Sequence, residues 1–177
     1  MKKILFILMA MVCLVACKDK KCEDCDQEAV EDSSSETLTV IGRYVGTVTV
    51  LNGNITDDYI HQGDTIEVIN TSGSNYNITF LRIKFSDYMP SLDITIPDLT
   101  GKYLANSETE IELYLSGSEP IVPLIGQEES ENYTITDFAA TLQASSGKSD
   151  IDLEMIVNID TEKRKAQYAT SFVGTKD

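Results

Sequence analysis

From Thr37 to the C-terminus the chain alternates between apolar and polar positions with a period of two, the pattern of β-strands that bury one face. The clearest stretch is 150–159, in which Asp152 and Glu154 stand between apolar residues. We expect these two acids to face water and the apolar set to face the core. The apolar set is Ile151, Leu153, Met155, Val157 and Ile159.

Eight further stretches have strand propensity, and most are bounded by turn residues such as Asn52-Gly53 and Gly63-Asp64. No segment after residue 37 keeps a helical period for more than about two turns, so the pattern predicts an all-β domain. In one stretch the apolar positions change phase after Phe80, which predicts a β-bulge or a sharp bend. The eight stretches are 42–50, 55–61, 65–70, 76–85, 92–97, 109–115, 133–142 and 166–173.

Eight or nine strands in about 140 residues favour a single up-and-down antiparallel barrel of about eight strands over residues 37–177, because closure removes open sheet edges. A two-sheet β-sandwich is the alternative. The bulky residues expected to point inward are enough to fill a small barrel, whereas Gly42, Gly46, Ala139 and Ala140 would leave space near one end. Those bulky residues are Val48, Phe80, Ile94, Leu113, Leu142, Leu153 and Phe172.

The N-terminus predicts an exported lipoprotein. Lys2 and Lys3 precede an apolar run, Ile4 to Val15, that would be about 18 Å long as a helix, too short for a hydrocarbon core of about 30 Å. Residues 1–16 are therefore interpreted as a signal peptide. The sequence Leu14-Val15-Ala16-Cys17 resembles the bacterial lipobox, which implies that Cys17 is acylated and becomes the first residue of the mature protein.

Residues 17–36 are acidic and polar, and we interpret them as a lipidated, disordered tether. Their acidic start resembles the surface-export signals of Bacteroidetes lipoproteins. Cys22 and Cys25 form a C-x-x-C pair without the context of a redox motif or the four ligands of a zinc site. A local disulfide and two incidental thiols both remain open for this pair.

Charge and composition exclude several functions. The chain has 14 Lys plus Arg against 29 Asp plus Glu, so its net charge is −15, which argues against nucleic acid as a partner. With His61 as the single histidine, a site that needs two or three imidazoles is excluded within this chain. No catalytic motif is present, so we expect neither an enzyme nor a cofactor or metal site.

Two acidic groups are candidate sites. Glu108, Glu110 and Glu112 alternate along a predicted strand and could bind calcium, although a solvated strand face is the favoured interpretation. Asp57-Asp58 near His61 could act as an acid and base pair, but a surface turn is favoured because no nucleophile accompanies it.

Three motifs resemble the calycin-like lipoproteins of Bacteroides and relatives. They are Gly42-Arg43-Tyr44-Val45-Gly46-Thr47-Val48, Ile83-Lys84-Phe85 and Leu92-Asp93-Ile94-Thr95-Ile96-Pro97-Asp98-Leu99. The resemblance covers most of 40–160 and implies a lipocalin-like barrel. Tyr44 stands where calycins commonly have the tryptophan of Gly-x-Trp, so no ligand-binding or catalytic residue is carried over.

The sequence therefore predicts a lipid-anchored protein of the bacterial outer membrane, facing the periplasm or the cell surface. Two function classes stay open. One is a binding module for a small apolar ligand within or at the mouth of the barrel. The other is a structural or protein-interaction component of the envelope with a filled barrel. The expected partners are the membrane, through the acyl chains, and either that ligand or an envelope protein.

Overall fold

The computed structural model describes residues 38–51, 58–87 and 89–177. The predicted signal peptide, the tether with Cys17, Cys22 and Cys25, and the Asn52-Gly53 turn lie outside the described residues. Within the described ranges, no helix has the length and hydropathy needed to cross a bilayer.

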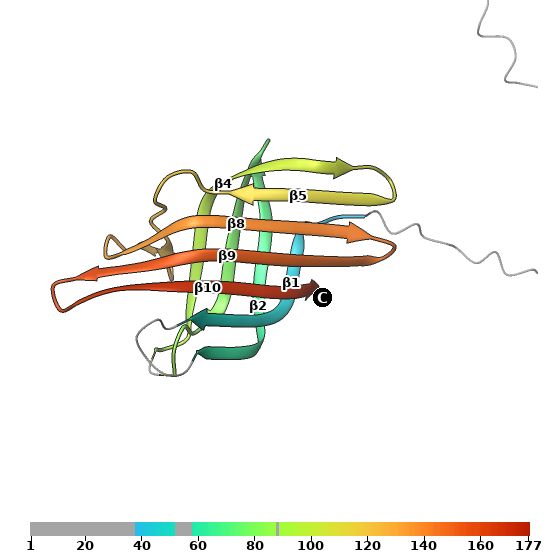
Figure 1. The fold of residues 1–177 in the computed structure, drawn as a ribbon. Coiled ribbons are helices and arrows are strands. Elements are labelled where there is room, and N and C mark those ends of the chain that lie inside the picture. Colours follow the sequence, from blue (N-terminus) through green and yellow to red (C-terminus); the bar gives the residue numbers. More distant parts are fainter. Residues whose placement is uncertain (1–37, 52–57, 88) are drawn as a thin grey trace, which may run out of the picture. The chain divides into compact units, whose positions relative to one another are not determined.

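The described residues form an all-β structure whose strands close into a barrel (Figure 1). Each of eight strands pairs antiparallel with the next in the order β1, β2, β3, β4, β5, β8, β9, β10, and β10 pairs back to β1. This confirms the up-and-down barrel over the sandwich. The bounds are β1 Gly42–Leu51, β2 Tyr59–Ser72, β3 Asn75–Ile83, β4 Leu92–Asn106, β5 Glu110–Ser116, β6 Leu124–Ile125, β7 Glu128–Glu129, β8 Tyr133–Ser145, β9 Lys148–Thr161 and β10 Arg164–Lys176.

Two predicted strand ends are wrong. Gly63-Asp64 is not a turn, because β2 runs through it as one strand and absorbs Gly63, with a φ of 81°, as a bulge opposite Gly46 and Thr47. Likewise β4 continues past Pro97 to Asn106. In both cases residues with turn chemistry serve as bends inside a long strand, which a barrel needs in order to curve.

The predicted phase change after Phe80 is confirmed as a bulge. Phe80 and Ile83 are both buried although they are three residues apart, and Arg82 between them has a φ of 57°. The Arg82 amide, displaced from the ladder, donates to Asp93 Oδ1 at 2.7 Å. The extra residue thus turns the following side chain back to the core without leaving a backbone donor unpaired.

The same device recurs in two other strands. In β4 the buried Ile96 and Leu99 flank Asp98, with a φ of 57°, whose amide donates to Asn77 Oδ1 at 3.1 Å. In β8, Asp137 has a φ of 52° and lies between the buried Ile135 and Phe138. Figure 1 shows the outcome, in which β8, β9 and β10 cross in front of the upright first part of β4.

Among the described residues, apolar side chains occupy the barrel interior. All seven bulky residues expected to point inward are buried, and so are Ile151, Leu153, Met155 and Val157, while Asp152 and Glu154 are exposed. The expectation that Gly46 leaves space is wrong, because a Cβ there would lie 2.8 Å from the ring of Phe172 and 2.1 Å from the Val173 carbonyl oxygen. Ala139 is not fully buried, since it precedes the inward-facing Ala140 in β8.

A segment between β5 and β8 covers a gap in the barrel side. β5 pairs only with the second half of β4, at 100–106, and with the second half of β8, at 139–145. Over the first halves, β6 pairs with β4 at Ile94, and Ile121 exchanges two backbone hydrogen bonds with Ile135 of β8. Glu128-Glu129 forms the short strand β7 of this segment.

The segment that leads into β1 closes the end of the barrel at which β1 begins. Val40 is buried, and its carbonyl oxygen accepts a hydrogen bond from the buried Tyr44 hydroxyl at 2.6 Å. Burial and, to a smaller extent, the charge of Asp150 raise the pKa of Tyr44 above its ordinary value of 10.0. Tyr44 thus fastens the chain that arrives from the predicted tether to the core.

The register of β9 predicts a contrast between neighbouring residues. Leu153→Ala should lower the free energy of unfolding by about 2–5 kcal/mol, because it removes a buried side chain and leaves a cavity. Glu154→Ala should stay within about 0.5 kcal/mol, as exposed substitutions usually do. Denaturant melts monitored by circular dichroism measure both, and a larger loss for Glu154→Ala would contradict the register.

Tyr44 predicts a pH dependence. Because its pKa is raised in the folded state, the unfolded chain releases this proton first, so this contribution is complete below pH 10 and is lost as pH rises above 10. Tyr44→Phe should remove that part of the alkaline decline and cost about 1 kcal/mol at pH 7, where the Val40 carbonyl loses its donor. Denaturant melts between pH 7 and 11 test this, with Tyr114→Phe on the outer side of β5 as control. An unchanged alkaline slope in Tyr44→Phe would contradict it.

Candidate functional site

A buried carboxylate lies at the end of the barrel where β2 begins, called the mouth here. Asp64 alternates with the buried Ile66 and Val68, so it points to the inner side of β2, and its side chain is only 6% exposed. Its partner across the ladder is Gly46. A carboxylate in this position is costly unless donors satisfy it.

Asp64 binds the single histidine of the chain. Its Oδ1 lies 2.9 Å from His61 Nδ1, whereas its buried Oδ2 has no hydrogen-bond partner among the described residues. The His61 side chain is 52% exposed and its ring lies parallel to that of Tyr59, with 6.2 Å between centroids. Burial and, to a smaller extent, the charges of Asp64 and Asp87 raise the pKa of Tyr59 above its ordinary value.

This arrangement orients an imidazole without completing a recognised reaction centre. A carboxylate on Nδ1 fixes the ring and leaves Nε2 as the atom available to solvent, as in many proton-transfer and metal sites. In the described ranges, no group of three or more His, Cys, Asp and Glu side chains could hold a metal ion. The cluster therefore supplies one oriented imidazole at the mouth.

In the structure, the acid that pairs with His61 is a different residue from those that the sequence suggested. Asp57 lies outside the described residues, and the exposed Asp58 precedes β2. The acid on His61 is Asp64, which sequence reasoning had placed in a turn. The spacing His-x-x-Asp was visible in the sequence, but it brings the two side chains together only because the strand bulges at Gly63.

The three alternating glutamates are not arranged as one row on a strand. Glu108 lies in the bend before β5, while Glu110 and Glu112 belong to β5. Glu112 Oε1 accepts a hydrogen bond from Gln143 Nε2 at 3.2 Å. The favoured interpretation of a solvated surface agrees with this arrangement.

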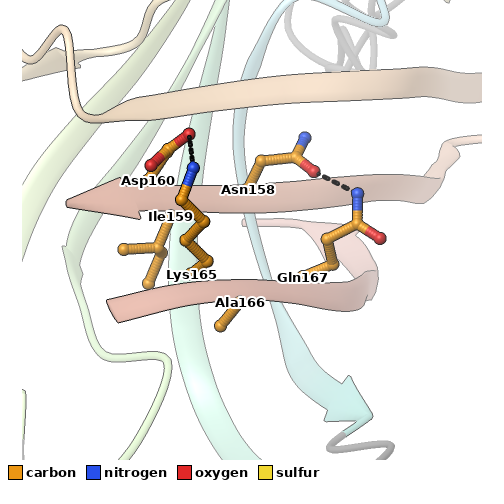
Figure 2. Close-up of a pocket in the computed structure, with 6 residues that line it drawn as sticks. All are labelled: Asn158, Ile159, Asp160, Lys165, Ala166 and Gln167. Atoms are coloured by element: carbon orange, nitrogen blue, oxygen red, sulfur yellow. Dashed lines mark hydrogen bonds and ion pairs between the residues drawn. The ribbon is translucent and has the colours of Figure 1, made fainter. Parts of the chain in front are cut away.

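A hollow of about 520 Å³ lies on the β9–β10 hairpin (Figure 2). Figure 2 shows that its polar groups pair with each other, Lys165 with Asp160 at 3.1 Å and Gln167 with Asn158 at 2.8 Å. Ile159 and Ala166 alternate with these residues along the two strands, so the lining side chains point to opposite sides of the hairpin. The hollow does not gather free polar groups toward a ligand.

The apolar cavity at the Phe85 end of the barrel is small. Phe85, Met89 and Leu92 line it together with side chains of the segment between β5 and β8 and of β8, and its volume is about 30 Å³. This is the room of about one water molecule, far below the ~300 Å³ of a typical small-molecule pocket.

A second hollow, of about 480 Å³, lies beside the segment that closes the barrel end. The Thr39 carbonyl oxygen in its wall already accepts hydrogen bonds from Lys176 Nζ at 2.9 Å and Ser149 Oγ at 3.3 Å. These bonds fasten residues 38–39 to the barrel, so the hollow is the seam along which this segment packs.

One side of the barrel carries an outer surface without charged residues, called the uncharged face here. Its residues alternate with the buried positions of β1, β2 and β10 and pair with each other across the ladders. Four of the eight large apolar side chains that are exposed in the described part lie on it. The residues of the face form four rows of neighbours across β2, β1 and β10. The rows are Thr65, Val45 and Thr175; Gln62, Thr47 and Val173; Ile60, Thr49 and Ser171; and, on β1 and β10 alone, Leu51 and Ala169.

Charged residues border this face. On the β9 side, Asp150, Asp152 and Glu154 pair with Thr175, Val173 and Ser171 and form an acidic column. At the end where β1 begins, Arg43 Nε lies 3.3 Å from Glu67 Oε1. Sequence reasoning missed the face because β10 is far from β1 and β2 in the chain, and only the register between these strands shows that the uncharged positions adjoin.

No protein-family model matches this sequence, and no curated protein matches it. A solved structure to which the chain is similar is the crystal structure, at 2.40 Å resolution, of a "putative outer membrane protein" from Bacteroides fragilis. The two chains share 15% sequence identity with a TM-score of 0.45, over 77% of this chain and 51% of the other. This chain thus spans about half the length of that protein.

The Asp64–His61 contact predicts a specific stability effect. His61→Ala should lower the free energy of unfolding by about 1–3 kcal/mol, because it removes the donor of a buried carboxylate. Adding Asp64→Asn to that variant should recover part of the loss, since a neutral amide costs less to bury than a carboxylate. Denaturant melts measure these changes, with Asp58→Ala as a control expected within about 0.5 kcal/mol. Equal values for His61→Ala and Asp58→Ala would contradict the assignment.

Proposed function

We propose that this protein is an exported, lipid-anchored component of the bacterial envelope that acts through the outer surface of a filled barrel, by contact with protein. The observation that carries the proposal is the packed interior. Tyr44, Phe80 and Phe172 are fully buried in it, and the Phe172 ring lies over Gly46 and Gly174.

The packing favours a protein-interaction component over a carrier of small apolar ligands. A carrier needs an enclosed cavity of about 300 Å³ or more, whereas the apolar cavity that described residues line at the Phe85 end has about 30 Å³. A close-packed interior can admit a ligand only by displacing core side chains, which costs several kcal/mol. The outer surface is then the part of the barrel that can recognise something.

The polarity of the barrel supports a position in water. Apolar side chains face inward, while Asp152 and Glu154 stand exposed in the middle of β9. A membrane-spanning barrel has the reverse pattern, with an apolar band on its outer side. Attachment to a membrane would therefore depend on the acyl chains predicted at Cys17, and the acidic tether would hold the barrel away from anionic lipids.

The test combines anchoring and contact in one experiment on the full chain, expressed in a Gram-negative host that acylates lipoproteins. A photo-reactive residue replaces Ile60, which lies on the uncharged face and is 62% exposed. We expect the protein to incorporate labelled fatty acid, to sediment with membranes and to form a light-dependent adduct identified by mass spectrometry. Cys17→Ser should lose the label and leave the membrane fraction.

The matched control places the photo-reactive residue at Leu104 on β4, which is 55% exposed and lies outside the face. Label retained by Cys17→Ser would overturn the anchor. The same adduct yield at Ile60 and Leu104, or no adduct at either position, would overturn the role of the outer face. A small apolar molecule retained at one per chain in native mass spectrometry would restore the carrier function instead.

A further inference from the structure

We infer that the uncharged face is the surface on which two copies of this chain associate. The inference rests on the proposed function, since it names the partner for the outer surface. It starts from the side chains that β1, β2 and β10 hold in water: Ile60 is 62% and Val173 is 58% exposed. The centre of a protein interface is poor in charged residues, and this face has that composition in a chain with 24% charged residues.

Charge restricts where two copies of this chain can meet. The chain has a net charge of −15, so two copies repel each other wherever their acidic surfaces meet. A basic partner would be drawn instead to acidic positions such as Asp152 and Asp160 rather than to a surface without charge. Two copies can therefore approach each other with the least repulsion through the uncharged face.

The acidic column on β9 also restricts the symmetry of the pair. Two faces packed against each other are related by a two-fold axis lying in the interface. If that axis ran across the strands, Asp152 and Glu154 of one copy would approach the same residues of the other. With the axis along the strands, this column lies over the β2 and β3 side, where Thr65 and its partner Leu81 are uncharged. The second arrangement avoids like charges and packs the sheets nearly aligned.

The size of the face predicts a weak dimer. Its eleven residues are about half of the roughly 20–30 on one side of a standard interface, so they can form its centre, with charged neighbours as the rim. Contacts smaller than a standard interface are typical of weak, transient association, so we expect a dissociation constant in the micromolar range. Anchoring through Cys17, as proposed above, would confine the copies to one membrane and raise their effective concentration.

Sedimentation velocity of the full chain carrying Cys17→Ser, so that no acyl chain recruits detergent, tests the inference at about 1–200 µM. We expect a monomer of 19.6 kDa that converts to a dimer as concentration rises. Val173→Glu should weaken the dimer by roughly tenfold or more, because it places a carboxylate without a partner in the desolvated contact. Thr47→Glu, at the position paired with Val173, should do the same and provides a second variant if the first fails to fold.

Leu104→Glu is the matched control, since Leu104 is 55% exposed on β4, and it should leave the dimer unchanged. A chain that stays monomeric throughout, or equal weakening by Val173→Glu and Leu104→Glu, overturns the inference. A monomer whose Ile60 cross-links in cells to a different protein overturns the second copy while the proposed function stands. Binding of the Cys17→Ser chain to phosphatidylcholine vesicles that Val173→Glu abolishes would assign the face to a bilayer and also overturn the inference.

Discussion

The packing of Phe172 at the seam between β1 and β10 is the contact on which the rest of the structure depends. Gly46 and Gly174 pair across this seam, and a Cβ at Gly174 would lie 2.7 Å from the Phe172 ring. The ring fits there only because both positions lack a side chain. It then meets Phe80 edge to face, with 6.2 Å between centroids, and so joins the seam to β3. The same side chain therefore packs at the seam that closes the barrel and in its core.

This constraint also decides where recognition can occur. Since the inward positions of β1 and β10 are used for closure, the outward positions of the same strands are the ones free to vary with function. There the two strands carry Val45, Thr47 and Val173 without a charge among them, although charged residues begin on the next strand, β9. The apolar residues left in water at the seam contribute little to the fold, which has its own core.

Alternation along one strand made part of this structure predictable. The inward set around Leu153 follows from period two alone, because a one-residue shift would bury Asp152 and Glu154. Gly63-Asp64 misled the prediction, since the residues that favour a turn also favour a bulge, and the length of β2 depends on its partner β1. For the same reason, the sequence did not predict the Asp64–His61 contact. The uncharged face depends on the register between strands at opposite ends of the chain, which no local pattern contains.

The Asp64–His61 contact and the uncharged face differ in what they cost the fold. Asp64 is buried and, in the described structure, one of its carboxylate oxygens has no partner, which lowers stability. An apolar residue at this position would avoid that cost. The uncharged face carries no such cost in the monomer, but it removes repulsion that a chain of this charge otherwise has on every side. A protein built only to fold would need neither feature. The uncharged face on the seam strands therefore supports the proposal that this protein acts through the outer surface of its barrel.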